Sequence, residues 1–306
     1  MDTQYVLTTE RLCKKYRSFK ALNDLTMHVP KGAIYGFVGR NGAGKTTLIR
    51  VICGLQSVSA GSFTLYGTKN TELGISKARR RLGAIVETPS IYLNMTAKEN
   101  LKQQYRILGL PSFDGIDELL ALVGLSDTGS KRAKNFSLGM RQRLGIAVAL
   151  CGSPDFLILD EPINGLDPQG IIEIRELILK LNREKEITVL ISSHILDELA
   201  KLATHYGFID QGRLVKELSA EELEAACRKC VRMTVTDTQA AARVLDGMEL
   251  EYKVLDDKTV DVFAKPIFSD LAAALGKEGC SVISIEERDE SLESFFISLV
   301  GGESRA

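Results

Sequence analysis

A glycine-rich segment at residues 39–46, GRNGAGKT, carries the residue types that bind phosphate groups. It satisfies the spacing GxxxxGK[ST], in which glycines let backbone N–H groups converge on phosphate oxygens. The side chain of Lys45 can reach the β- and γ-phosphates, and the hydroxyl of Thr46 can bind Mg²⁺. The loop therefore predicts a site for a nucleoside triphosphate with Mg²⁺. The residues expected to contact this nucleotide are Gly39, Asn41, Gly42, Ala43, Gly44, Lys45, Thr46 and Thr47.

Two adjacent carboxylates, Asp160 and Glu161, follow an apolar run at residues 156–159. Asp160 can hold Mg²⁺, whereas Glu161 points to a different side and can polarise an attacking water. His194 follows another apolar run and can reach the γ-phosphate. Strand-end carboxylates are sometimes only helix caps, and a lone histidine is usually structural. Because ligands of open parallel sheets bind at the carboxyl ends of the strands, we instead predict ATP hydrolysis by Lys45, Glu161 and His194.

These side chains need a parallel sheet to bring them together, and the apolar pattern predicts one. A continuous apolar run at 34–38 precedes the phosphate loop, and a helix pattern at 46–55 follows it. From residue 156 onward, strand and helix patterns alternate, which is typical of an α/β core. The predicted strands are 156–159, 188–192 and 206–210, and the predicted helices are 171–183 and 195–203. A partly antiparallel β region is expected from strands at 5–9, 25–29 and 63–66, and a helical insertion over about 88–150.

The pattern changes after residue 218, where the order β-α-β-β-α-β indicates a small ferredoxin-like sandwich. Its predicted strands are 231–235, 252–255, 260–263 and 282–286, and its helices are 239–245 and 271–275. A last helix at 292–300 places Phe295, Phe296 and Leu299 on one apolar face. We therefore predict an α/β P-loop NTPase cassette over residues 1–218 and an accessory α+β domain over residues 219–306.

Composition narrows the class of protein. The 306 residues are 44% hydrophobic and 26% charged, as in ordinary folded proteins. The formal net charge of -1 lacks the basic excess of a nucleic-acid binder, so we expect no nucleic-acid partner and interpret the basic run at 77–81 as a solvated helix face. The sequence shows neither an apolar stretch of the roughly eighteen residues that a membrane span needs nor a signal peptide, which predicts a cytoplasmic location. Cys227 and Cys230 lack further zinc ligands and are expected to be helix-surface thiols.

With these motifs in place, residues 5–215 resemble the ATP-binding cassette family. The family's signature motif is matched in form by residues 136–140, FSLGM, followed by the start of a helix. The resemblance implies that two ATP molecules lie between two cassettes, in a homodimer or a heterodimer. It also implies that Ser137 and Gly139 contact the ATP bound by the other subunit, with the serine hydroxyl and the glycine amide as donors.

Further positions match or depart from the family pattern. Residues 165–167 match the loop after the second acidic motif, where the resemblance implies that Asp167 couples the two sites. Tyr16 resembles the aromatic residue that stacks on adenine, although a core or surface aromatic is an alternative interpretation. Leu138 and Met140 replace a glycine and a glutamine of the family's motif. We expect hydrolysis to survive these two changes.

Glu87 is the third departure, because the family has a glutamine there that touches Mg²⁺ and the attacking water. A carboxylate at this position would bind the metal more strongly but would also repel the γ-phosphate. Glu87 and the segment at 292–301 are similar to a subgroup of the family, the motor subunits of bacitracin and lantibiotic exporters. That similarity implies an antimicrobial-peptide substrate.

The resemblance also implies a partner, a membrane-spanning permease that holds the cassette at the inner face of the cell membrane. We expect the permease to bind in a groove near residues 87–100, where Ile91, Tyr92, Leu93 and Met95 would be exposed or half-buried; an internal core is the alternative. One competing hypothesis is a soluble, non-transport ATPase of the same family. Another is a regulatory switch in which the second domain senses a ligand.

Overall fold

The computed structural model describes residues 4–226, 230–263, 267–288, 295–297 and 299. Contacts between Cα atoms divide the chain into two units, Met1–Ala220 and Glu221–Ala306, so the division falls two residues after the predicted one. The first unit contains the phosphate loop and the two adjacent carboxylates, Asp160 and Glu161. Each unit is described by itself below.

The central sheet of the first unit has six strands in the order β10-β9-β3-β8-β7-β6. The strands are β3 (Ile34–Val38), β6 (Leu82–Ile85), β7 (Phe156–Asp160), β8 (Thr188–Ser193), β9 (His205–Asp210) and β10 (Arg213–Ser219). All are parallel except β10, which pairs antiparallel with β9. Every residue of β3, β7 and β8 is buried, as the continuous apolar runs predict for strands covered on both faces. The predicted α/β class is confirmed.

The register of this sheet aligns the strand ends. Val38 pairs with Ser193, Asp160 with Ser192, and Ile85 with Leu159. The residues that follow these strands therefore emerge at one edge of the sheet. They are Gly39, Glu161, His194 and, two residues after β6, Glu87.

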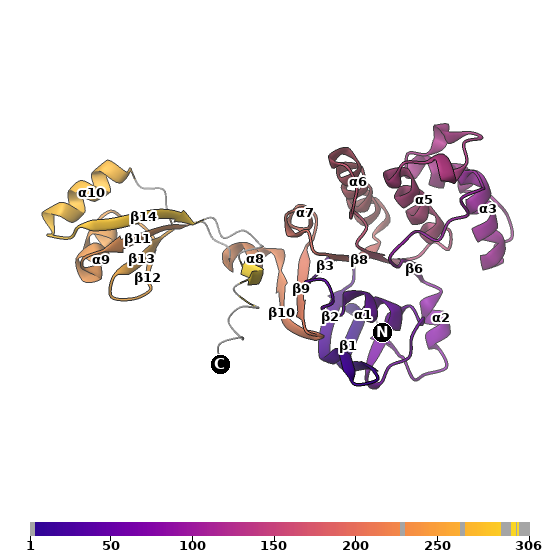
Figure 1. Ribbon diagram of the computed structural model, residues 1–306, viewed down its shortest axis with the longest axis horizontal. Helices are drawn as coiled ribbons and strands as arrows, with labels where there is room; N and C mark the ends of the chain where they lie inside the picture. Colours follow the sequence, from indigo (N-terminus) through magenta and orange to yellow (C-terminus); the bar gives the residue numbers. More distant parts are fainter. Residues whose placement is uncertain (1–3, 227–229, 264–266, 289–294, 298, 300–306) are drawn as a thin grey trace. The chain divides into compact units, whose positions relative to one another are not determined.

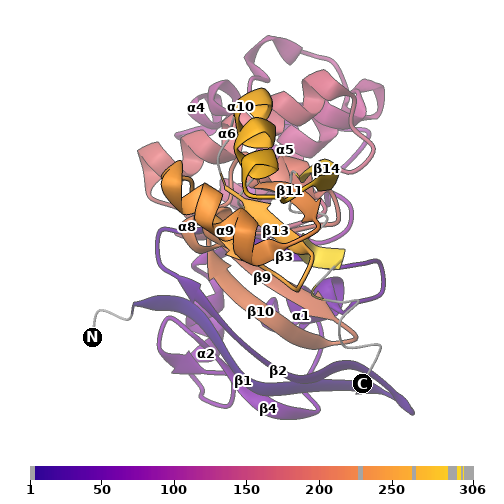
Figure 2. The same ribbon diagram turned by 90° about the vertical axis from the view of Figure 1, so that its left-hand side faces the viewer.

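A second sheet has the order β2-β1-β4-β5 and encloses α1 against the central sheet (Figure 2). Its strands are β1 (Tyr5–Tyr16), β2 (Phe19–Pro30), β4 (Ala60–Leu65) and β5 (Thr68–Lys69). Helix α1 (Lys45–Ile52) buries Leu48, Ile49, Val51 and Ile52 in the core that both sheets share. It ends three residues earlier than predicted, because Gly54 has a left-handed φ of 81°. The short helix α2 (Ile75–Arg79) contains part of the basic run, and Arg79 donates to the carbonyl of Ile52.

The predicted helical insertion consists of α3 (Ala97–Leu108), α4 (Ile116–Leu122) and α5 (Leu138–Leu150), with 3-10 turns at Ser126–Thr128 and Ala133–Asn135. Helices α6 (Pro168–Lys185) and α7 (Leu196–Ala200) cover the face of the central sheet opposite α1 (Figure 1). Helix α3 begins with a capping box between Thr96 and Glu99. Helix α7 is shorter than the predicted segment 195–203, since residues 201–203 form turns and irregular structure.

The second unit confirms the predicted order β-α-β-β-α-β. Strands β11 (Cys230–Val235), β12 (Tyr252–Val254), β13 (Thr259–Val262) and β14 (Val282–Arg288) form an antiparallel sheet in the order β12-β13-β11-β14. Helices α9 (Thr238–Gly247) and α10 (Phe268–Lys277) pack on the sheet face that carries Val231, Met233 and Val235. Helix α8 (Ala220–Ala226) precedes this sandwich.

Two predictions fall partly outside the described residues. Cys230 is half-buried at the start of strand β11, so the prediction of a helix-surface thiol is wrong for this residue. Cys227 lies outside the described residues, as do several residues of the predicted helix 292–300. Within that segment, residues 295–297 and 299 are helical, with Phe295 and Phe296 buried.

Candidate active site

The phosphate loop joins the end of β3 to the start of α1, and its glycines are required by space and by backbone conformation. Gly42 and Gly44 have φ values of 83° and 114°, which side chains rarely allow. A Cβ atom on Gly44 would lie 2.6 Å from the carbonyl oxygen of Ala21, and one on Gly39 would lie 2.6 Å from that of Ile209. No side chain caps the N-terminus of α1, so the first N–H groups of the helix are left for an anion.

Lys45 is the buried cation of this loop. Its side chain is 6% exposed, and Nζ donates to the carbonyl of Gly39 at 2.6 Å and to that of Arg40 at 3.3 Å. Nζ also lies 3.2 Å from Oε1 of Glu161. The structure therefore brings two of the predicted catalytic side chains into direct contact.

Glu161 joins Lys45 to His194. Its second carboxylate oxygen, Oε2, lies 2.7 Å from Nδ1 of His194. The backbone of Glu161 has a φ of 50°, and its N–H is held by the carbonyl and the hydroxyl of Ser192, at 3.1 and 3.0 Å. A left-handed conformation is uncommon at a residue other than glycine. These contacts leave a carboxylate fixed between two groups that bear or can bear positive charge.

Asp160 provides the local evidence for a metal site. The side chain is 1% exposed, and Oδ1 accepts a hydrogen bond from the Ser192 hydroxyl at 2.5 Å. Its other oxygen, Oδ2, is buried and has no hydrogen-bond partner. Buried carboxylate oxygens are normally paired, so this one fits a cation. Among the described residues no group of three or more acidic, histidine or cysteine side chains could hold a metal ion.

Glu87 lies two residues after β6, with a left-handed φ of 62°. Its carboxylate forms an ion pair with Arg50 of α1, with Oε1 2.6 Å from Nη2. Sequence reasoning missed Arg50, because nothing in the spacing of residues 50 and 87 links them. It also missed Ser192, whose position inside the apolar run of β8 offers only the weak signal of a polar residue in a buried strand.

The signature segment lies at the start of α5. Ser137 is the N-cap, and its hydroxyl accepts a hydrogen bond from the N–H of Met140 at 3.2 Å. Leu138 is 49% exposed, and its Cδ2 atom lies 3.4 Å from where a Cβ of Gly165 would be. Asp167 caps α6 by accepting from the N–H of Gly170 at 2.8 Å. The two predicted inter-subunit segments therefore pack against each other within one chain.

Tyr16 lies at the end of β1 and is 39% exposed. Its hydroxyl donates to Oε1 of Gln56, and the ammonium group of Lys14 lies 5.3 Å from the ring centroid. The ring is accessible to a planar ligand, so stacking on adenine stays a prediction.

A model of the family described as ABC transporter matches residues 22–164. The bacitracin transport ATP-binding protein BcrA of Enterococcus faecalis is 40% identical over 310 residues, covering 99% of this chain and 98% of that protein. The chain belongs to the ABC transporter family. As a member it is an ATP-binding subunit with ATPase activity.

Two further comparisons agree with this assignment. The lantibiotic transport ATP-binding protein SrtF of Streptococcus pyogenes is 43% identical over 212 residues, covering 69% of this ABC chain and 90% of that protein. A solved dimeric ATP-binding cassette, in a post-hydrolysis state bound to ADP and Pi, has the same fold. It aligns with a TM-score of 0.64 and 22% identity, covering 70% of this chain and 98% of that chain.

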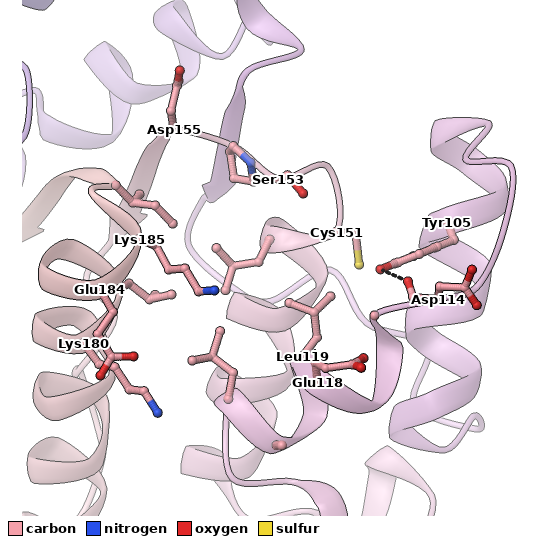
Figure 3. A pocket seen from close by; sticks show the side chains of 17 residues that line it. Tyr105, Asp114, Glu118, Leu119, Cys151, Ser153, Asp155, Lys180, Glu184 and Lys185 are labelled. Atoms are coloured by element: carbon pink, nitrogen blue, oxygen red, sulfur yellow. Dashed lines mark hydrogen bonds between the residues drawn. The ribbon is translucent and has the colours of Figure 1, made fainter.

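A separate groove of about 810 Å³ lies between α4, the end of α5 and α6 (Figure 3). Its lining includes Asp155, which precedes β7, whereas Asp160 ends that strand. The groove is therefore at the opposite edge of the sheet and is not the nucleotide site of this ABC subunit.

Among the residues that the structure describes, no helix has both the length and the apolar character that a membrane span needs.

Proposed function

We propose that this ABC subunit hydrolyses ATP to drive the export of an antimicrobial peptide through a separate membrane-spanning permease. The contact network of Glu161 with Lys45 and His194 carries the proposal for hydrolysis. The substrate class rests on the relatives that cover most of the chain, since one is named for bacitracin transport and another for lantibiotic transport.

The proposed roles follow from chemistry and position. Lys45 binds the β- and γ-phosphates, Glu161 polarises the attacking water, and His194 orients Glu161 and the γ-phosphate. Thr46, Asp160 and Glu87 would hold Mg²⁺, which supplies positive charge against the developing charge on the phosphate oxygens. The remaining loop residues, Gly39, Asn41, Gly42, Ala43, Gly44 and Thr47, surround the phosphates, and Tyr16 stacks on adenine.

Two cassettes complete the site. The N–H of Gly139 and the hydroxyl of Ser137 lie at a helix start, which favours contact with a γ-phosphate held by a second cassette. Asp167 couples the two sites through the segment that packs on Leu138. The solved fold neighbour is dimeric, which supports a pair of cassettes, either identical or similar to each other.

The permease docks at a hollow of about 510 Å³ between the core and the helical insertion. Its lining combines residues of α1, β6 and α5 with Glu87 and Ser90. Next to it, Tyr92 and Leu93 are 48% and 46% exposed, and Ile91 and Met95 are half-buried, as predicted. Exposed apolar side chains beside a hollow suit a protein partner. Docking there would hold the cassette at the inner face of the cell membrane.

The experiment begins with purification of the tagged chain from solubilised membranes of its native host. A stoichiometric multi-span partner, followed by ATP-dependent export of bacitracin or a lantibiotic from cells or vesicles, is the expected result. The Glu161→Gln variant should retain the partner and ATP binding but lose export. Association with ribosomes or DNA in place of a membrane partner would favour a non-transport ATPase and overturn the proposal.

A further inference from the structure

Arg50 and Glu87 form an ion pair that connects the phosphate-binding helix to the loop after β6. The distance between Nη2 and Oε1 is 2.6 Å, and the side chains are 35% and 57% exposed. Arg50 lies in the last turn of α1, whose N-terminus holds Lys45 and Thr46. The pair therefore joins the far end of the helix that starts at the phosphate loop to the segment that follows β6.

Several features distinguish this pair from an ordinary surface contact. Exposed ion pairs usually contribute little to stability. Here, however, the pair ties the segment after β6 to α1, and the φ of Glu87 is 62°, in the left-handed region. Both residues also line the hollow of about 510 Å³ between α1, β6 and α5. The contact with Arg50 thus holds the Glu87 carboxylate at the edge of the sheet where β3, β6, β7 and β8 end.

The carboxylates at this edge of the sheet explain why Glu87 needs a cation beside it. Asp160 and Glu161 already place two carboxylates there, and Lys45 is the buried cation that contacts Glu161. A further carboxylate at Glu87 adds negative charge where a triphosphate must bind. Like charges in a partly desolvated site repel unless a cation lies close to one of them.

We propose that Arg50 is a positioning residue that neutralises Glu87 and sets the direction of its carboxylate, so that a glutamate is tolerated beside Mg²⁺ and ATP. The inference rests on the proposed function in one respect, the placement of Glu87 near the metal and the γ-phosphate. It assigns Arg50 a role that depends on the charge of residue 87. A role in complementing the helix dipole at the end of α1 would not depend on that charge.

The test is a double-mutant cycle on the purified chain, with Arg50→Gln, Glu87→Gln and the double variant. The measurements are the dissociation constant of Mg·ATP and the Mg²⁺ concentration that gives half-maximal ATPase activity. Arg50→Gln should weaken Mg·ATP binding about tenfold, the size of a coupling that one close charge pair can supply. The double variant should bind Mg·ATP as tightly as Glu87→Gln alone. Arg50→Lys should keep most of the affinity, because it retains the positive charge.

Lys98→Gln is the matched control, since it removes one cation from an exposed ion pair with Asp117 in the helical insertion. It should leave both measurements unchanged. Equal weakening by Arg50→Gln in the wild-type and Glu87→Gln backgrounds would overturn the inference, and so would no weakening in either. In both cases, loss of turnover in Glu161→Gln would show that the proposed hydrolytic function still stands. Thermal unfolding of each variant identifies any that fails to fold.

Discussion

Nδ1 of His194 lies 2.7 Å from Oε2 of Glu161, and this contact joins the ends of two neighbouring parallel strands. The other oxygen of Glu161 contacts Lys45 at 3.2 Å. The carboxylate that should polarise water is thus held from both sides. His194 is therefore one of the two side chains that hold this carboxylate in place.

The His194→Ala variant is therefore expected to lower kcat for ATP hydrolysis about a hundredfold, the lower end of the range for the acid–base group, Glu161, that His194 holds in place. The dissociation constant of ATP should change little, because Lys45 and the loop remain. The control is His28→Ala, which breaks a comparable contact of 3.1 Å with Glu217 away from the loop and should keep kcat. A His194→Ala variant with wild-type kcat would remove His194 from the catalytic set.

The Ser192→Ala variant should weaken the metal site. The Ser192 hydroxyl donates to Oδ1 of the buried Asp160, so its loss leaves that oxygen without this hydrogen bond, while the N–H of Glu161 keeps its bond to the Ser192 carbonyl. We expect the free energy of unfolding to fall by about 1–3 kcal/mol and the Mg²⁺ requirement of the ATPase to rise. Urea unfolding and a Mg²⁺ titration of the activity measure the two effects.

The Thr9→Val variant is the control that separates the loss of stability from the change in Mg²⁺ requirement. It removes another fully buried hydroxyl, which donates to the carbonyl of Leu25 in the antiparallel sheet. Its unfolding free energy should fall by a similar amount while the Mg²⁺ requirement stays at the wild-type value. An unchanged Mg²⁺ requirement in Ser192→Ala as well would contradict the assignment of Asp160.

Much of the site could be predicted because short apolar runs in the sequence reveal where the parallel strands end. The apolar runs before Gly39, Asp160 and His194 mark parallel strands, and parallel strands bring their carboxyl ends to one edge. The ion pair between Arg50 and Glu87 has no such signal, since it depends on how α1 packs beside the end of β6.

The lengths of the strands also could not be predicted fully from the sequence. Strand β1 extends to Tyr16, although only residues 5–9 were predicted, because residues 10–16 are rich in charge and lack strict alternation. Their strand conformation comes from pairing with β2 and β4, with register shifts around Arg11, whose φ is 44°. Tertiary pairing of this kind overrides local preference.

Glu198 of α7 should contribute to the loss of folding stability at acidic pH. Hydrogen bonding and charge from Lys201, together with Arg175 of α6, hold the pKa of Glu198 below its usual range. A carboxyl group with a lowered folded-state pKa stabilises the protein above its unfolded-state pKa, and this contribution is lost as the pH falls through the folded-state value. Glu198→Gln should therefore be less stable than wild type at pH 7, with the difference shrinking below about pH 4.

Urea unfolding of both proteins across this pH range tests the prediction. Glu176→Gln is the matched control, because Glu176 contacts the same Arg175 at 3.8 Å but is 66% exposed. It should change stability much less than Glu198→Gln at every pH. A constant difference between wild type and Glu198→Gln from pH 7 to pH 3 would show that the pair with Lys201 and Arg175 does not shift the titration of Glu198.

The Gly44→Ala variant should abolish ATP binding. Its φ of 114° strains any side chain, and the added Cβ would lie 2.6 Å from the carbonyl oxygen of Ala21, so the start of α1 must move. Gly32→Ala is the control, since Gly32 also has a positive φ, 79°, but no atom within 4 Å of the new Cβ. That variant should lose only about 1 kcal/mol of stability and keep ATP binding. Thermal unfolding and ATP binding are measured on both, and wild-type ATP affinity in a folded Gly44→Ala variant would contradict the need for glycine in the loop.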